Sequence, residues 1–170
     1  MSLDGFIAGP GNDLSWLDVL APPEDNDMGF GALMESIDAL VMGRGTFDVV
    51  RSFDIPWPYT KPVIVMSKSM TVVPDDVGDV ELTALDVADL LAELETRGMT
   101  KLYIDGGAVV SSFVRAGLLD ELITTVIPVA LGGGTKLFSD LTEPSWFTHI
   151  SSEVFDNGMV QNTYRVQRQD

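Results

Sequence analysis

The chain has 170 residues, 45% of them apolar, which is near the usual size of one domain with one core. We therefore expect a single domain over residues 1–170. The absence of Cys and the single His149 exclude a disulfide framework, a thiolate metal site and a zinc-binding His cluster. Ten Lys plus Arg against 26 Asp plus Glu give a formal net charge of −16, which disfavours nucleic-acid and anionic-lipid partners.

No apolar stretch approaches the length that crosses a bilayer, and Met1 to Gly9 lack the basic flank of a signal peptide. We therefore expect a cytoplasmic protein with no membrane partner. A small phosphorylated ligand remains compatible with the acidic charge, because its site needs only local hydrogen-bond donors. A basic residue beside a glycine turn is therefore informative.

Four segments have apolar residues at helical spacing. They are Asp27 to Asp38, Thr46 to Ser52, Asp86 to Arg97 and Val109 to Ala116. The third is the best defined, because Asp86 is a suitable N-cap and Gly98 a suitable C-terminal stop.

Short apolar runs predict strands that are buried on both faces. They are Ala39 to Met42, Val63 to Met66, Lys101 to Ile104 and Leu122 to Val129. Near the end, Phe147 to Phe155 and Met159 to Val166 flank Asn157 and Gly158, a strong hairpin signal. The fold class is therefore α/β: a mixed, mostly parallel sheet flanked by helices on both faces, with a C-terminal antiparallel hairpin.

Two of these strands end in paired or spaced glycines before a helix, at Val41 to Phe47 and at Leu102 to Ala108. Glycines allow close backbone approach, a helix N-terminus offers free N–H groups, and Arg44 adds a forked charge, so both turns suit a phosphate. Ordinary strand-to-helix turns are the alternative. Neither segment has the Gly-x-Gly-x-x-Gly fingerprint, and Gly132 to Lys136 lacks P-loop spacing, which disfavours a Rossmann domain or an NTPase.

Three segments in this order, Ser2 to Gly9, Met42 to Phe47 and Ile104 to Gly107, resemble the dihydrofolate reductase superfamily. The closer resemblance is to the C-terminal reductase domain of riboflavin-biosynthesis proteins, which shares the patterns at Ala116 to Leu122 and Pro128 to Gly134. The resemblance covers nearly the whole chain. It implies a dihydrofolate-reductase-like fold and NADPH as the cofactor, with no metal.

The resemblance also implies which residues hold NADPH. Ile7 and Ala8 would lie against the nicotinamide, and Ser67 and Lys68 near the 2′-phosphate, unless the latter two are an exposed polar turn. The phosphate and diphosphate contacts would come from Gly43, Arg44, Gly45, Thr46, Ile104, Gly106, Gly107, Ala108 and Val109. In this superfamily the paired glycines are joined by a cis peptide bond, so Gly106–Gly107 is expected to be cis.

Two carboxylates are candidates for the catalytic proton donor, because burial can raise the pKa of an acid toward neutrality. Asp27 precedes the predicted strand at the spacing of the dihydrofolate reductase carboxylate, although Pro22 to Asp25 blur the register and Asp27 is also a plausible helix N-cap. Asp4 is the second candidate, or else a turn-forming Asp-Gly.

Five side chains are candidates to wall a flat heteroaromatic substrate, of which we expect two to do so while the rest belong to the core. They are Phe6, Trp16, Phe30, Met34 and Trp57.

The resemblance implies hydride transfer from NADPH to an imine-type carbon of a pteridine-like or ribosylamino-pyrimidine substrate. Dihydrofolate reductase activity and a non-catalytic NADPH-binding module are the alternatives, and a homodimer is expected. The family pattern also has a full apolar strand before Ser2, central in the sheet, where here only Met1 precedes the motif. Either the natural start lies upstream or the first strand is shortened, which would weaken the sheet.

Overall fold

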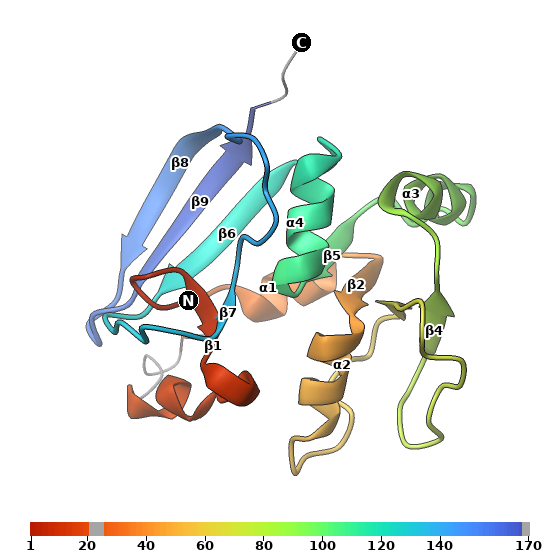
Figure 1. Cartoon of the computed structure of the whole chain (residues 1–170), viewed down its shortest axis with the longest axis horizontal. Helices are drawn as coiled ribbons and strands as arrows, with labels where there is room; N and C mark the ends of the chain where they lie inside the picture. The colour runs from red at the N-terminus through yellow and green to blue at the C-terminus, as the bar shows by residue number, and fades with distance from the viewer. Residues whose placement is uncertain (21–25, 168–170) are drawn as a thin grey trace.

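A parallel sheet of four strands lies at the centre of the computed structural model, which describes residues 1–20 and 26–167 (Figure 1). In the order β4-β3-β2-β5, its strands are β2 (Ala39–Gly43), β3 (Val63–Met66), β4 (Val80–Thr83) and β5 (Leu102–Asp105). The side chains from Ala39 to Met42 are fully buried, as expected for a strand covered on both faces. The predicted apolar strands are therefore confirmed, and β4 is an addition that the sequence did not indicate.

Helices cover both faces of this sheet, also as predicted. They are α1 (Phe30–Ser36), α2 (Arg44–Arg51), α3 (Val87–Thr96) and α4 (Gly107–Arg115). Successive side chains of a strand point to opposite faces, so Leu40 and Met42 pack with Phe47 of α2, while Val41 packs with Phe113 of α4. The core thus consists of one apolar layer on each side of the sheet.

The C-terminal part forms a separate antiparallel sheet. Its strands, in the order β6-β9-β8, are β6 (Glu121–Val126), β8 (Phe147–Val154) and β9 (Val160–Val166). Gly158 has a φ of +85° in the turn between β8 and β9, a conformation that glycine adopts readily. The predicted terminal hairpin is confirmed.

Within the described residues, no strand joins these two sheets, since β5 pairs only with β2 and β6 pairs only with β9. Met1 makes a single parallel-type bridge to the end of β6: its amino group donates to the Thr125 carbonyl at 2.5 Å, and the Ile127 N–H donates to the Met1 carbonyl at 2.8 Å. In the described residues, the parallel and the antiparallel sheet are therefore separate. Helix α4 spans the interval between them, because its buried face packs against side chains of both sheets.

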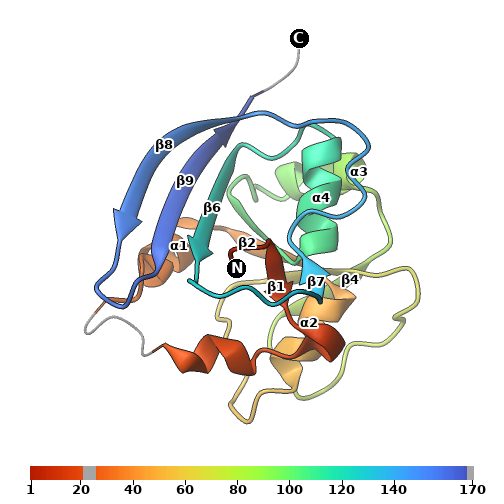
Figure 2. The same cartoon turned by 60° about the vertical axis from the view of Figure 1, so that its left-hand side comes forward.

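A third, two-stranded antiparallel unit lies beside the N-terminal end of α4 (Figure 2). It consists of β1 (Phe6–Ala8) and β7 (Thr135–Lys136), and two short 3-10 turns, Pro10–Asn12 and Ser15–Val19, follow β1. Gly134 makes this pairing possible, because a Cβ on it would overlap the Ala8 carbonyl oxygen. These elements bring the start of the chain over the ends of the parallel strands.

Several predicted element bounds differ from the structure. The first helix begins at Phe30 instead of Asp27, and the Leu122 to Val129 strand ends at Val126, before Pro128, which cannot donate to a ladder. The helix after β5 begins at Gly107, two residues before its predicted start. Asp86 is confirmed as the N-cap of α3, because its carboxylate accepts hydrogen bonds of 3.0 Å from the N–H groups of Ala88 and Asp89. None of the helices in the described ranges has the length and apolar character needed to cross a bilayer.

Phe113 is the residue through which we expect α4 to hold the two sheets together. The variant Phe113→Ala should lower the free energy of unfolding by about 3–5 kcal/mol, because this ring is only 1% exposed and its loss leaves a cavity between the sheets. Urea denaturation followed by circular dichroism measures the loss. Phe30→Ala is the matched control, since that ring is 48% exposed, and an equal loss in both variants would contradict the role of α4.

Candidate functional site

A cleft of about 430 Å³ lies at the carboxyl ends of β2 and β5, where both strands leave the sheet at glycines. Ligands of open α/β sheets usually bind at this edge. Its lining comes from the two glycine turns, from β1, from the 3-10 segment and from the inner side of α2. The lining residues include Ile7, Ala8, Leu14, Leu17, Gly43, Gly45, Thr46, Val49, Val50, Phe53, Tyr59, Asp105, Gly106, Gly107, Ala108, Val109 and Thr135.

The two glycine turns meet at the floor of this cleft. The register of β2 with β5 sets Met42 opposite Asp105, so the residues that follow both strands are neighbours. A Cβ on Gly106 would overlap the Thr46 hydroxyl oxygen, and a Cβ on Gly43 would lie 3.2 Å from a methyl group of Val109. The backbone of each turn is therefore packed directly against the other.

The expected cis bond between Gly106 and Gly107 is wrong, because this bond, like every other in the described residues, is trans. The chain turns instead through the backbone angles of Gly106, with φ +89° and ψ +132°. L-residues with a side chain rarely adopt this conformation. The turn therefore depends on glycine at this position for two reasons, its backbone angles and its contact with Thr46.

Both helices that start at the cleft lack a side-chain N-cap. Neither Gly43, which precedes α2, nor Gly106, which precedes α4, can supply one, so the first N–H groups of both helices are available to a ligand. Such groups, together with the positive end of the helix dipole, bind phosphate oxygens. The glycine cradle and its two helix ends fit the diphosphate of a dinucleotide.

Nine of the residues predicted to bind the cofactor line the cleft: Ile7, Ala8, Gly43, Gly45, Thr46, Gly106, Gly107, Ala108 and Val109. The remaining four lie outside the lining. Arg44 is half-exposed beside the mouth, where its guanidinium donates to Asp48 at 3.3 Å and to Ser69 at 3.1 Å. The Ser67 hydroxyl accepts N–H bonds inside its own turn, Lys68 is exposed, and Ile104 belongs to the core.

Asp105 is the one carboxylate among the described lining residues, and the sequence reasoning did not single it out. Its Oδ1 accepts a 2.7 Å hydrogen bond from the N–H of Gly106. Burial raises the pKa of the Asp105 carboxyl above its ordinary value, while that hydrogen bond opposes the shift. Burial, with a smaller contribution from the Asp105 charge, raises the pKa of Tyr59, which also lines the cleft, to about 12. Its position in the sequence could have identified Asp105 as a site residue, because it ends a parallel strand directly before two glycines.

Asp27 lies outside the cleft lining, at the start of α1. Its two carboxylate oxygens accept hydrogen bonds from the N–H groups of Gly29 at 2.9 Å and Gly31 at 2.7 Å. Asp27 is therefore not the N-cap itself, which is Gly29, but its carboxylate holds the start of the helix from two residues earlier. The loop at Pro22 to Asp25, which blurred its register, lies outside the described residues.

Asp4 also lies outside the lining and ties the start of the chain to the glycine-rich segment before β7. Its carboxylate accepts hydrogen bonds from the Ser2 hydroxyl at 2.7 Å and from the N–H groups of Leu131 at 3.1 Å and Gly132 at 2.7 Å. The Ser2 bond, followed by the two backbone bonds, lowers the pKa of Asp4 to about 2. Such a group stays ionised and is a poor proton donor at neutral pH.

The five predicted ring-wall residues do not line the cleft. Trp57 packs edge-on against Phe47 and Tyr59, with ring centroids 5.6 and 5.4 Å apart, and Met34 packs in the same core layer. Trp16 is buried in a separate apolar cluster. Phe6 lies under the Lys136 ammonium at 5.7 Å, and Phe30 is 48% exposed. The apolar wall comes instead from Leu14, Leu17, Val49, Val50 and Phe53.

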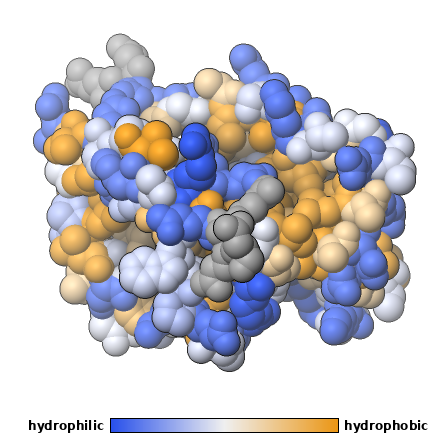
Figure 3. All heavy atoms as spheres, turned by 90° about the horizontal axis from the view of Figure 1, so that it is seen from above, coloured by the Kyte–Doolittle hydropathy of each residue, from blue (hydrophilic) through white to orange (hydrophobic). Residues whose placement is uncertain are grey.

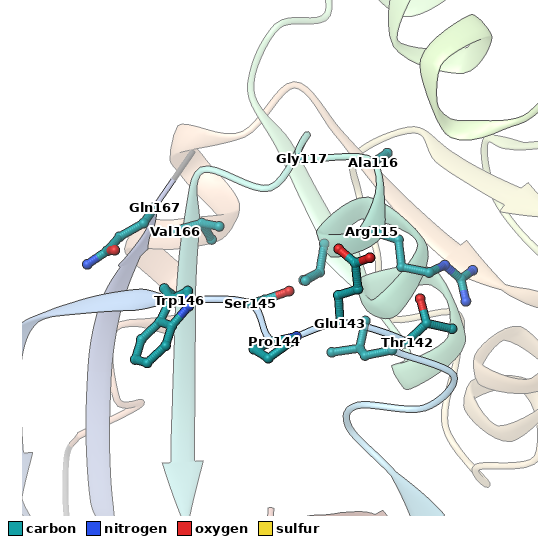
Figure 4. Close-up of a pocket in the computed structure, with 12 residues that line it drawn as sticks. Arg115, Ala116, Gly117, Thr142, Glu143, Pro144, Ser145, Trp146, Val166 and Gln167 are labelled. Carbon is teal, nitrogen blue, oxygen red and sulfur yellow. The ribbon is translucent and has the colours of Figure 1, made fainter. Parts of the chain in front are cut away.

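A second cavity, of about 500 Å³, lies between the carboxyl end of α4, the segment 141–146 and the end of β9 (Figure 4). Figure 3 looks onto the molecule from above and shows a broad group of apolar side chains to the right of the grey atoms. In the close-up, Trp146 and Arg115 extend in opposite directions, and Arg115 donates to the Asp140 carbonyl and the Ser112 hydroxyl, both at 3.1 Å. The carboxyl end of α4 carries partial negative charge here, unlike the amino end at the cleft.

The fold and the paired glycine turns define a dihydrofolate-reductase-like α/β domain. Residues 1–161 match the RibD C-terminal domain family, and the chain therefore belongs to that family. It is a RibD-type reductase-like domain, related to the reductases of riboflavin biosynthesis.

Two proteins of Bacillus subtilis are similar in sequence. The uncharacterized protein YwjB is 34% identical over 146 residues, which cover 84% of this chain and 80% of YwjB. The uncharacterized protein YyaP is 29% identical in an alignment of 175 residues that spans 96% of this chain and 90% of YyaP.

Solved structures share the fold. A protein from Shewanella sp. PV-4, provisionally named a riboflavin biosynthesis protein, is 45% identical with a TM-score of 0.93 over 99% of this chain and 96% of that one. The Thermotoga maritima diaminohydroxyphosphoribosylaminopyrimidine deaminase/5-amino-6-(5-phosphoribosylamino)uracil reductase has a TM-score of 0.71 at 19% identity, with 98% of this chain covering 54% of that one. Dihydrofolate reductase from Enterococcus faecalis, complexed with NADP(H), has a TM-score of 0.63 at 18% identity over 99% and 93% of the two chains.

The hydrogen bonds of Asp4 make the stability of the fold depend on pH, and the stability decreases as the pH falls. A folded-state pKa of about 2, below the ordinary value of 3.8, stabilises the fold above pH 4, and this contribution is lost as the pH falls through 2. We therefore expect Asp4→Asn to unfold at lower urea than the wild type at pH 5, and the difference to shrink at pH 2.5. An equal difference at both pH values would contradict a role for the Asp4 charge.

Proposed function

We propose that this protein is an NADPH-dependent reductase that transfers a hydride to an imine-type carbon of a small nitrogen heterocycle, of the pteridine-like or ribosylamino-pyrimidine kind. The observation that carries the proposal is the cleft itself, in which two glycine turns with free helix N-termini meet a protonatable carboxyl and an apolar wall. Membership of the RibD C-terminal domain family supports a reductase. The shared fold with a dihydrofolate reductase complexed with NADP(H) supports the choice of cofactor.

The cofactor would be held by residues of both glycine turns. The first N–H groups of α2 and α4 would bind its phosphates, and Ile7 and Ala8 would lie against the nicotinamide. Arg44, with Ser67 and Lys68 on the next turn, would bind the 2′-phosphate. When bound, NADPH supplies the hydride, and the protein's part is to position the acceptor and exclude water.

Asp105 would supply the proton. Reduction of an imine adds a hydride to the carbon and a proton to the nitrogen, and Asp105 is the ionisable acid of the described cleft lining. Its burial keeps the carboxyl protonated to higher pH than an exposed Asp, which is the state needed for donation. In this proposal the donor role passes from Asp27 and Asp4, whose carboxylates cap backbone N–H groups elsewhere, to Asp105.

The cofactor proposal is tested by Arg44→Ala. We expect NADPH binding to weaken by roughly 1.5 to 3 kcal/mol, because a charge-assisted phosphate contact is lost. Titration of protein fluorescence with NADPH measures the change. Arg51→Ala is the control, because Arg51 lies at the other end of α2, where it pairs with Asp76 at 2.9 Å. Unchanged NADPH affinity of Arg44→Ala would remove Arg44 from the site.

The proton-donor proposal is tested by Asp105→Asn. We expect kcat to fall about 10²- to 10⁴-fold while NADPH affinity is retained, because the amide cannot donate the proton yet has nearly the same shape. In the wild type, kcat should decline as the pH rises through the raised pKa of Asp105, since the protonated form is the active one, and this decline should be absent from the variant. Full activity of Asp105→Asn, measured from the loss of NADPH absorbance, would exclude the role.

A further inference from the structure

The wall that α2 and the 3-10 segment contribute to the cleft is apolar, and the one acid of the described lining, Asp105, lies at its edge beside the second glycine turn. Val49, Val50 and Phe53 of the α2 segment face into the same space as Leu14 and Leu17. Apart from Asp105 and Tyr59, the described lining residues carry no ionisable side chain, and so no Lys, Arg or His. This half of the cleft therefore offers a ligand apolar contact, a carboxyl and a phenol.

Three cations on elements that line the cleft have partners outside its lining. Arg44 is held by Asp48 and Ser69 at the glycine end, where the proposed function assigns it to NADPH. At the far end of α2, the Arg51 guanidinium stacks 5.7 Å from the centre of the Phe47 ring and pairs with Asp76. On the β7 side, the Lys136 ammonium lies over the ring of Phe6, 5.7 Å from its centre. None of these side chains is a lining residue of the cleft.

A phosphate group placed against this wall would be poorly accommodated. It would exchange water for apolar side chains without gaining a charged partner, which is unfavourable for any ion. It would also lie near Asp105, so that a second negative charge opposes it, and the net charge of −16 adds long-range repulsion. The NADPH phosphates avoid this penalty because the uncapped N-termini of α2 and α4, and Arg44 beside the first of them, supply hydrogen-bond donors to them.

We propose that the substrate of this site is a flat nitrogen heterocycle without a phosphate group, whose ring packs against Val50 and Phe53 and whose imine-type nitrogen faces Asp105. The proposal rests on the proposed reductase function and narrows its substrate class. The proposed substrate differs from the one in the name of the Thermotoga maritima reductase, which carries a phosphoribosyl group. A neutral ring gains the apolar contacts of the wall, and its nitrogen meets the proton donor.

The test compares 5-amino-6-(ribosylamino)uracil with its 5′-phosphate, since the pair differs only in the charged group. Calorimetric titration of the protein saturated with NADP⁺ measures binding without turnover, and NADPH oxidation gives kcat/KM. We expect the unphosphorylated compound to bind at least tenfold more tightly and to have at least tenfold higher kcat/KM. Equal or tighter binding of the phosphate, or binding of neither compound, would overturn the proposal. Failure of NADPH itself to bind would instead overturn the proposed function.

The variant Phe53→Arg provides a gain-of-preference test. Phe53 is 43% exposed, so a charged side chain is tolerated there, and its guanidinium can reach into the cleft. We expect this variant to bind the 5′-phosphate at least tenfold more tightly than the wild type does. Ile55→Arg is the matched control, because it adds the same charge at an exposed position outside the cleft lining. The same gain in both variants would show that net charge, not the cleft wall, sets the preference, and would contradict the proposal.

Discussion

The close packing of the Gly106 backbone against the Thr46 side chain is the contact on which the cleft depends. It brings the ends of two parallel strands close enough for the helices that follow to begin at one place. A side chain at Gly106 would separate the turns and would strain the backbone, because the φ of +89° suits glycine alone. Two uncapped helix N-termini and a strand-ending carboxyl then share one apolar space.

Helix α4 connects this local geometry to the rest of the molecule. Its buried face closes the interval between the parallel sheet and the antiparallel sheet, where β5 and β6 have no shared neighbour among the described strands. Its amino end opens into the cleft and its carboxyl end borders the second cavity. Because the helix dipole has opposite sign at its two ends, the amino end attracts an anion and the carboxyl end does not. The same helix therefore stabilises the fold and places its positive amino end in the cleft.

Three aspartates show how environment, and not residue type, decides the chemistry of a carboxyl group. Asp27 and Asp4 each accept backbone N–H bonds and serve to hold a helix start and a loop. For Asp4, these bonds and the Ser2 hydroxyl keep the pKa near 2. Asp105 accepts one such bond and is otherwise desolvated, so its pKa moves in the opposite direction. Only the last combination, inside a cleft, keeps a carboxyl protonated to higher pH than an exposed Asp.

The sequence by itself determined the buried strands, the capped helix α3, the terminal hairpin and the two glycine turns. Each of these is encoded locally, by an apolar run, by Asp86, or by Asn157 and Gly158, and local signals survive in the folded chain. Tertiary structure alone decided the pairing of β1 with β7 and the residues of the apolar wall. It also decided which carboxylate enters the cleft. Leu14, Phe53 and Asp105 lie far apart along the chain and share a surface only after β2 and β5 pair, a long-range contact that spacing in the sequence does not encode.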